Sequence, residues 1–378
     1  MKTEGLGQMR EVSQDPTRHR YDNTFSFSNF EFLLTFFQME DSPEILSRTL
    51  RVPRFVATNI SLSSNHIVAS LRLCMLSCED FPPYGPSNST GNLFLQLICD
   101  GILSSADQLF ALTTNTHSKV EMVELNVVIE IYRAQAQKYP SDWDVFHGIL
   151  IPGSFSSAYE TKPWIERLKE VIQKEIHAKQ RKTLAVCFGH QVFSHSFQGE
   201  SQGLCIPCPS GQQAGRRVST LTKECMILLQ KAQYSNERYS SDIELIYTHG
   251  DMVKQLPSCA VPLFGDENVP IQAAVYFASE TEVEVFRKYC DTSVVLNDDN
   301  KKIPKPYAFT FQAHPEYYSN QGMNVTFTNV VKAMGKRNPD LQPEFENALM
   351  DTKEHRSKMQ EESISVMVSV GRLLGWFH

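Results

Sequence analysis

From about residue 68 onwards, short apolar runs alternate with segments long enough to form helices, and few folds accommodate that order. Leu71–Leu76 suits a buried strand, and Val123–Tyr132 alternates in polarity and is rich in β-branched residues, as strands are. Strands separated by helix-length segments are typical of crossover units, which build a largely parallel sheet with helices on its faces. The sequence therefore predicts an α/β fold, a three-layer sandwich around a largely parallel central sheet.

Further elements continue this order. Asp144–Ile151 suits a strand that Pro152-Gly153 ends, and Thr161 is expected to cap the next helix, whose apolar residues recur at helical spacing. The segment Glu344–Trp376 is compatible with helix and is expected to cover the sheet. The other predicted elements are a helix at Leu93–Ile102 and strands at Thr183–Cys187, Ile243–Tyr247, Ile271–Phe277 and Tyr307–Phe311.

The chain divides into three segments by this reading. Residues 1–66 begin polar and then pass through an aromatic patch with no period of 2 or 3.6, so we expect an N-terminal extension of uncertain order. Residues 67–340 carry the α/β alternation and form the predicted domain. Residues 341–378 form a predicted C-terminal helical segment that packs on that domain.

Charge and cysteine content limit the partners and the compartment. A net charge of −7 with scattered basic residues gives no electrostatic reason to expect nucleic acid or an anionic membrane as partner. The nine cysteines are odd in number and follow no disulfide framework, which indicates free thiols in a reducing compartment. No apolar run approaches the roughly 18 residues of a membrane span, and the acidic N-terminus lacks the apolar core of a secretory signal. We therefore expect a cytoplasmic protein.

The segment Ala185–Gln191 has the pattern of a nucleophile elbow. A small residue precedes Cys187 by two positions and Gly189 follows it by two, between a predicted strand and a predicted helix. Such a corner raises the sulfur above the edge of the sheet. The helix that follows directs its unpaired N–H groups at the sulfur, which favours the thiolate. Cys187 is therefore the candidate nucleophile.

A second short segment supplies the partners that a nucleophilic thiol needs. His314 and Glu316 follow directly after the predicted strand at Tyr307–Phe311, and Pro315 stiffens the backbone between them. The carboxylate can turn back onto one imidazole nitrogen while the other nitrogen faces the cysteine. Alone, His-Pro-Glu is also typical of a surface loop, but with the cysteine elbow it indicates a Cys-His-Glu triad.

Together these motifs resemble the class I glutamine amidotransferases, especially stand-alone proteins similar to the glutaminase domain of GMP synthase, which include the γ-glutamyl peptidases. The family elbow Gly-x-Cys-x-Gly-His-Gln is matched by Ala185–Gln191, and the family His-Pro-Glu element by His314–Glu316. The Ser-His-x-Asp element is approximated by Thr248–Asp251, and Pro152–Ser154 resembles the glycine-containing oxyanion loop. The resemblance covers about residues 70–335 in the family order.

This resemblance implies a flavodoxin-like class I glutamine amidotransferase domain and a chemistry. Cys187 would attack a γ-glutamyl amide, in glutamine or in a γ-glutamyl peptide or conjugate, and form a glutamyl thioester. His314 would act first as base and then as acid, and Glu316 would orient it. Water would then release glutamate, with no cofactor.

The resemblance also implies roles for residues around the triad. The N–H groups of Gly153 and Phe188 would hold the oxyanion, and Gln191 would bind the amino-acid end of the substrate. His249 and Asp251 would contribute to that binding or serve only to shape their loop. We expect a small γ-glutamyl substrate as partner. A synthase or acceptor protein would be a further partner if the chain is a glutaminase subunit.

Two departures from the family pattern leave alternatives open. Ala185 stands where the family elbow has its first glycine, and Cys205-x-x-Cys208 has no second pair of ligands nearby, so no metal site is predicted. The chain also lacks a phosphate-cradling glycine-rich loop of the pyrophosphatase kind. The alternatives to a self-contained hydrolase are a glutaminase subunit that delivers ammonia to a separate synthase, and a catalytically degenerate binding module.

Overall fold

The computed structural model describes residues 42–56, 69–79, 82–85, 87–113, 119–199, 202–232, 240–292 and 303–377. Every element named below lies within the unit that begins at Pro43. In these ranges the strands form one sheet of ten strands and a separate pair.

Five strands at the centre of the large sheet run parallel. They lie side by side in the order β3 (Lys119–Arg133), β2 (Ala69–Ser77), β4 (Gly148–Ile151), β5 (Thr183–Val186) and β12 (Ala308–Phe311). Counted along the chain this is the order 2-1-3-4-5 of the flavodoxin-like folds. The predicted α/β fold with a parallel sheet at its centre is therefore confirmed.

Antiparallel strands extend both edges of this parallel core. β1 (Glu44–Val56) pairs with β3 on one side. On the other side β11 (Ala273–Tyr276), β10 (Ala260–Gly265), β7 (Gln213–Leu221) and β8 (Asp242–His249) follow β12 in that order. The separate pair is β6 (Leu204–Pro207) with β9 (Asp251–Gln255). Five of these strands, β1, β6, β7, β9 and β10, were not predicted from the sequence.

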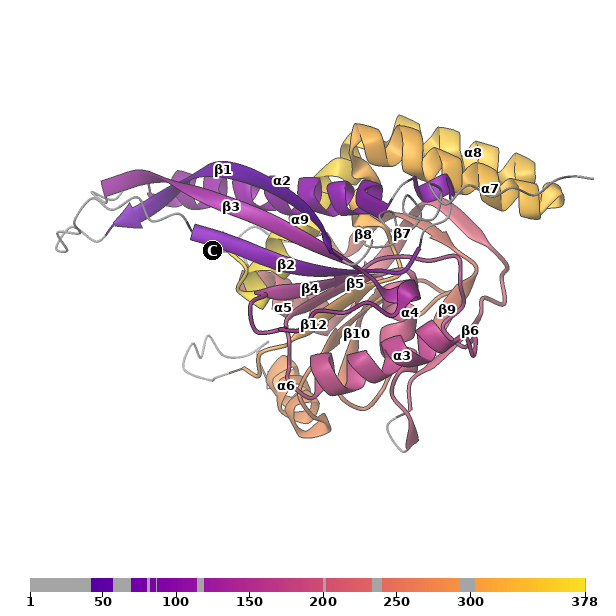
Figure 1. Cartoon of the computed structure of the whole chain (residues 1–378), viewed down its shortest axis with the longest axis horizontal. Coiled ribbons are helices and arrows are strands. Elements are labelled where there is room, and N and C mark those ends of the chain that lie inside the picture. Colours follow the sequence, from indigo (N-terminus) through magenta and orange to yellow (C-terminus); the bar gives the residue numbers. More distant parts are fainter. Residues whose placement is uncertain are drawn as a thin grey trace, which may run out of the picture. The chain divides into compact units, whose positions relative to one another are not determined.

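Helices cover both faces of the sheet, which confirms the three layers (Figure 1). Leu73 and Met75 of β2 belong to the core cluster on one face, whereas Cys74 and Leu76 belong to the cluster on the other, as the alternation of a strand requires. One cluster includes side chains of α2 (Ser87–Thr113), α5 (Lys223–Ala232), α6 (Glu280–Thr292) and α9 (Arg356–Leu374). The other includes side chains of α3 (Pro163–Val171) and α4 (Phe188–His195).

Two more helices, α7 (Thr328–Arg337) and α8 (Gln342–Glu354), belong to a third cluster that also holds Ile246 of β8. Among the described helices, none has both the length and the apolar character needed to cross a bilayer. The remaining short helical elements are η1 (Pro82–Tyr84), η2 (Ala134–Ala136), η3 (Ile172–His177), η5 (Pro315–Tyr318), η6 (Gly322–Phe327) and η7 (Pro339–Leu341).

Two local predictions were wrong. The strand predicted over Asp144–Ile151 begins only at Gly148, because the backbone before it turns: Asp142 accepts a hydrogen bond from the Asp144 N–H at 2.9 Å. Thr161 does not cap α3, since the residue before the helix is Lys162, which makes no side-chain cap. Pro163 starts the helix instead, and its missing N–H costs nothing at that position.

The structure places part of the predicted N-terminal extension in the sheet. Glu44–Val56 forms β1, whereas residues 1–41 and 57–68 lie outside the described residues. In the C-terminal segment, Met367 and Val370 of α9 are buried in the main core cluster. The division of the chain at residues 66 and 340 stays a prediction.

The close packing of α4 on β4 gives a first test. A Cβ atom built at Gly189 would lie 2.2 Å from the carbonyl oxygen of Ile151, a backbone atom that cannot move aside alone. We expect Gly189→Ala to lower the free energy of unfolding by about 1–3 kcal/mol or more, measured by urea denaturation.

Gly335→Ala is the matched control. The nearest atom to its new methyl group would be Gln342 Cγ at 3.5 Å, an ordinary contact, and alanine favours helix over glycine by about 1 kcal/mol. The control should leave stability unchanged or raise it. Equal losses in the two variants would contradict the packing account.

Candidate active site

Cys187 occupies a strained corner between β5 and α4. Its backbone has φ 55° and ψ −111°, a region that side chains other than glycine rarely adopt and that costs about 1–3 kcal/mol. The Cys187 N–H donates to the Phe311 carbonyl at 2.7 Å, and the Cys187 carbonyl accepts from the Gln191 N–H at 3.1 Å. The predicted strand therefore ends at Val186, and the predicted turn into a helix is present.

Small residues on both sides of Cys187 allow this corner to pack. Gly189 has no room for a side chain against β4, as described above. Ala185 is fully buried and lies in register between Ile151 of β4 and Thr310 of β12. Its methyl group belongs to the core cluster on the face that α3 and α4 cover. The alanine that departs from the family pattern is thus accommodated in the core.

His314 and Glu316 form a buried hydrogen-bonded pair after β12. His314 Nδ1 lies 2.8 Å from Glu316 Oε1, and each side chain is only 1% exposed. Because the carboxylate accepts this bond, Nδ1 carries a hydrogen and Nε2 is left for another partner. Among the described residues Nε2 has no hydrogen-bond partner.

The surroundings of His314 favour its protonated form. Burial by itself lowers the pKa of this imidazole, but the nearby charges of Glu316 and Cys187 and the hydrogen bond to Glu316 outweigh burial and raise it to about 10.

The Tyr317 ring stacks on His314 and was missed by the sequence analysis. The two ring centroids are 4.2 Å apart and the planes differ by 4°. Tyr317 is itself buried, so the ring limits the positions that the imidazole can take. It directly follows Glu316, but a single aromatic residue in an irregular turn gives no periodic signal.

Gly153 lies beside both segments that the sequence predicts to be catalytic. A methyl group built at Gly153 would lie 3.2 Å from His314 Cε1 and 3.8 Å from Cys187 Sγ. The three residues follow β4, β5 and β12, which are neighbours in the sheet and run parallel. They meet at the carboxyl ends of these strands, where α/β sheets bind ligands. Phe188 follows Cys187 as the first residue of α4.

A cavity of about 410 Å³ lies at Cys187 and includes the three predicted substrate-binding residues. Gln191 Nε2 donates to the backbone carbonyl of Asp251 and to Gln312 Oε1, both at 3.0 Å. These two bonds hold the amide in place. A cavity of this size falls in the range of small-molecule sites.

His249 and Asp251 both line this cavity, but their side chains differ in hydrogen bonding and in the direction in which burial shifts their pKa. His249 Nδ1 donates to the Asp251 carbonyl at 3.0 Å, and burial lowers the pKa of the ring to about 3, so it is neutral. His249 Nε2 is a buried acceptor with no partner in the described ranges. Asp251 Oδ1 accepts from the Tyr159 hydroxyl at 2.9 Å, and burial raises the pKa of its carboxyl.

One part of the cavity wall, contributed by α7 and Cys208, could not be predicted from the sequence. Met334 and Arg337 of α7 and Cys208 line the cavity. The Arg337 guanidinium lies over the Phe155 ring, 4.5 Å from its centroid. Met334 and Arg337 lie outside the motifs, and only the fold brings them to Cys187.

Metal ligands do not gather in the part of the chain that the structure describes: no group of three or more His, Cys, Asp or Glu could hold an ion there. Cys205 and Cys208 are both free and buried. Cys208 Sγ instead contacts Ser210 Oγ at 3.2 Å and Gln213 Nε2 at 3.5 Å.

The protonation of His314 gives a second test. In the resting protein we expect its imidazole to titrate well above the usual value of about 6.5, because Glu316 and Cys187 favour the charged ring. Glu316→Gln removes one of these charges, so burial should then dominate and the pKa should fall. Nitrogen NMR of labelled histidines would measure both, with His314→Gln assigning the signal. An unchanged pKa in Glu316→Gln would contradict this account.

Comparison with known proteins places the chain in a family. A model of "Glutamine amidotransferase class-I" matches residues 107–333, more than half of the chain. The chain is 30% identical to γ-glutamyl peptidase 3 of Arabidopsis thaliana over 140 residues, 36% of this chain and 53% of that protein. It is also 30% identical to a glutamine-hydrolysing GMP synthase of Porphyromonas gingivalis over 147 residues, 39% of this chain and 25% of that protein.

These matches are partial, since the chain spans about half the length of the γ-glutamyl peptidases it resembles. Among solved structures, a glutamine amidotransferase from Thermotoga maritima aligns with a TM-score of 0.49 at 12% identity, covering 80% of this chain and 98% of that one. The family match rests on the larger part of the sequence and on the segment that contains Cys187 and His314. The chain belongs to the class I glutamine amidotransferase family.

Proposed function

We propose that this protein hydrolyses γ-glutamyl amides through a thioester on Cys187. The observation that carries the proposal is the meeting of Cys187 with the buried His314–Glu316 pair at one edge of the sheet, beside a cavity. A nucleophile, a base and an orienting carboxylate are the parts that covalent acyl transfer needs.

In the resting site the proton of the Cys187–His314 pair resides on the imidazole, which its raised pKa supports. Sγ attacks the γ-carbonyl carbon of the substrate and forms a C–S bond. His314 Nε2 gives its proton to the departing nitrogen as the C–N bond breaks, so that ammonia or an amine leaves. Glu316 holds the ring through Nδ1 and stabilises its charged state.

Water completes the reaction on the same residues. His314, now neutral, takes a proton from a water molecule that attacks the thioester carbon. The C–S bond breaks, glutamate leaves, and the proton returns the pair to its starting state. The stacked Tyr317 ring keeps the imidazole in one orientation for both steps.

The N–H groups of Gly153 and Phe188 are the proposed oxyanion donors. Phe188 begins α4, where N–H groups have no acceptor within the helix, and Gly153 lies against both catalytic side chains. Loss of one such donor typically costs about 3 kcal/mol of transition-state stabilisation.

The substrate's amino-acid end would lie against Gln191, His249 and Asp251. The neutral His249 offers Nε2 as an acceptor for an ammonium group, and Asp251 offers a carboxylate. The γ-glutamyl peptidase relatives support a γ-glutamyl peptide or conjugate as substrate, and the GMP synthase relatives support glutamine. All nine cysteines are free thiols, which supports the proposed cytoplasmic location.

The third test removes the nucleophile and its orienting group in turn. We expect Cys187→Ala to abolish glutamate release from glutamine and from γ-glutamyl peptides. Glu316→Gln should lower kcat by about 10²–10⁴-fold with little change in KM, because it leaves substrate contacts in place and disturbs only the imidazole. Enzymatic detection of glutamate measures both. Turnover by Cys187→Ala would exclude the proposed nucleophile.

A glutamine-like chloroketone gives the fourth test. Cys208 lines the same cavity as Cys187, so it is an internal control for labelling that depends only on access of the analogue to a thiol. We expect the analogue to alkylate Cys187 alone, because only that sulfur is aligned with the reacting carbon. Burial raises the pKa of Cys225, Cys259 and Cys290 to about 12, which leaves those thiols unreactive. Peptide mapping by mass spectrometry that finds the label on Cys208 would contradict the assignment.

A second candidate function is a glutaminase subunit that passes ammonia to a separate synthase. The similarity to glutamine-hydrolysing GMP synthases favours it. The purified chain would then be inactive alone and gain glutaminase activity with a co-purified protein. A chain that binds the chloroketone on no cysteine would favour the remaining alternative, a binding module without catalysis.

A further inference from the structure

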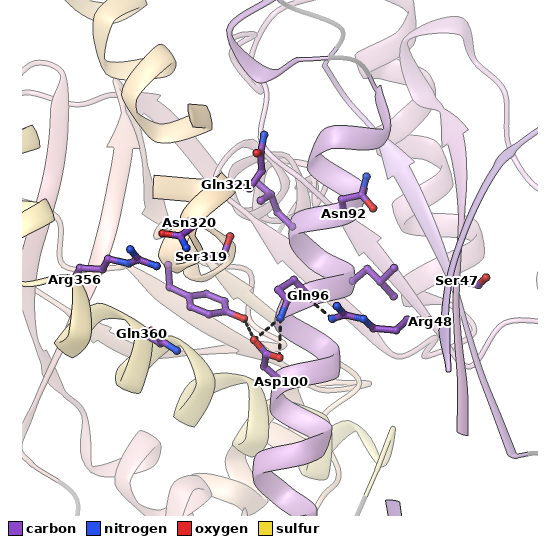
Figure 2. Close-up of a pocket in the computed structure, with 13 residues that line it drawn as sticks. Ser47, Arg48, Asn92, Gln96, Asp100, Ser319, Asn320, Gln321, Arg356 and Gln360 are labelled. Atoms are coloured by element: carbon purple, nitrogen blue, oxygen red, sulfur yellow. Dashed lines mark hydrogen bonds between the residues drawn. The ribbon is translucent and has the colours of Figure 1, made fainter. Parts of the chain in front are cut away.

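Figure 2 shows a second cavity. Its volume is about 600 Å³, and Cys187 is not among the residues that line it. β1, α2, η5 and the start of α9 contribute its walls. It exceeds the catalytic cavity of about 410 Å³ in volume, and it shares no lining residue with it. Nothing in the proposed reaction uses it.

A hydrogen-bonded network forms one part of this cavity. Asp100 accepts bonds from Gln96 Nε2 on both carboxylate oxygens, at 2.8 and 2.7 Å, and from the Tyr318 hydroxyl. Arg48 Nη1 donates to Gln96 Oε1 at 2.8 Å. Figure 2 shows Arg48, Gln96 and Asp100 joined by these bonds beside α2. The carboxylate of Asp100 is therefore supplied with donors from the protein itself.

Arg356 lines the same cavity but takes no part in this network. Its side chain is half-buried and, within the described ranges, makes no hydrogen bond or ion pair. Gln360 lies one turn further along α9 in the same wall and is likewise without a partner among the described residues. A guanidinium group carries five N–H donors in a planar arrangement that suits carboxylate and phosphate oxygens.

The charges of the lining favour an anion. Arg48, Arg356 and Asp100 are the charged residues of the described lining, so the balance is one positive charge. Arg48 donates to an uncharged amide oxygen, and in the described ranges no ion pair joins it to a carboxylate. Asn92, Asn320 and Gln321 add uncharged donors around the opening.

We propose that this cavity is a second ligand site, which takes a small organic anion bearing a carboxylate or phosphate group and influences the catalytic histidine. Arg356 is the main contact for the anionic group, with Arg48 and Gln360 as further donors. The chemistry does not distinguish carboxylate from phosphate, since both fit the guanidinium fork.

One short helical turn, η5, connects this cavity to His314. η5 carries Glu316, Tyr317 and Tyr318 in succession: the first holds His314, the second stacks on it, and the third donates to Asp100. A ligand that recruits Arg48 or Gln96 changes the bonds to Asp100 and hence the anchor of this turn. Binding in the second cavity therefore alters the position of His314.

Isothermal titration calorimetry of the full chain tests the site, with inorganic phosphate and succinate as separate probes at constant ionic strength. We expect saturable binding of one or both probes. Arg356→Gln should weaken it about tenfold or more, and Arg48→Gln should weaken it to a smaller extent. Which probe binds identifies the anionic group that the site prefers.

Arg287→Gln is the matched control, because it removes an exposed arginine of α6 that is not in the lining. It should bind the probes as the unmodified chain does. Absence of saturable binding by the unmodified chain overturns the site. Equal binding by folded Arg356→Gln, checked by its circular dichroism and thermal midpoint, overturns it as well.

The influence on His314 has its own readout, the rate at which iodoacetamide alkylates Cys187. This rate depends on the Cys187–His314 pair and not on any substrate, so the result is independent of whether the proposed hydrolysis is right. We expect a saturating probe to change the rate at least twofold in the unmodified chain and not in Arg356→Gln. An unchanged rate with bound probe overturns the influence on His314 and leaves the binding site standing.

Discussion

The site depends on the backbone of Cys187, which is held at φ 55° between β5 and α4. This conformation costs energy, and three features on its flanks maintain it. The Phe311 carbonyl accepts the Cys187 N–H, Ala185 fills a buried position in β5, and Gly189 lets α4 lie against the Ile151 carbonyl. Strain of this kind persists only where the surrounding packing fixes it. The result is a sulfur presented at the end of a parallel strand.

The second half of the site depends on the sheet order. β12 lies next to β5 and parallel to it, so the residues after Phe311 arrive beside Cys187 although more than a hundred positions separate them in the chain. Glu316 and Tyr317 then fix the His314 ring, one by a hydrogen bond at its edge and the other by contact with its face. Burial of this pair keeps water from weakening the interaction.

How far the sequence could predict this structure depends on whether a feature is local. The elbow at Ala185–Gln191 and the His-Pro-Glu turn are contiguous motifs beside buried strands, so the corner, the pair and the parallel core could be predicted. β7 could not, because three of its buried residues, Gln213, Gly215 and Ser219, are not apolar. Its Arg216 pairs with Glu244 and Asp351, which lie elsewhere in the chain. β10 could not be predicted either, because Pro262 within it argues against a strand. In the structure this proline lies at an irregularity in the pairing with β11. The wall from α7 and the Arg356 cavity join distant segments, so no spacing in the sequence predicts them.

The most direct test of the central claim is to trap the acyl intermediate. The protein would be mixed with a γ-glutamyl substrate, quenched in acid during turnover, digested and analysed by mass spectrometry. The account predicts one glutamyl group on the peptide that contains Cys187, and its disappearance once the substrate is exhausted. Glutamate release with no acyl group on Cys187 at any time, or with the group on another residue, would contradict it.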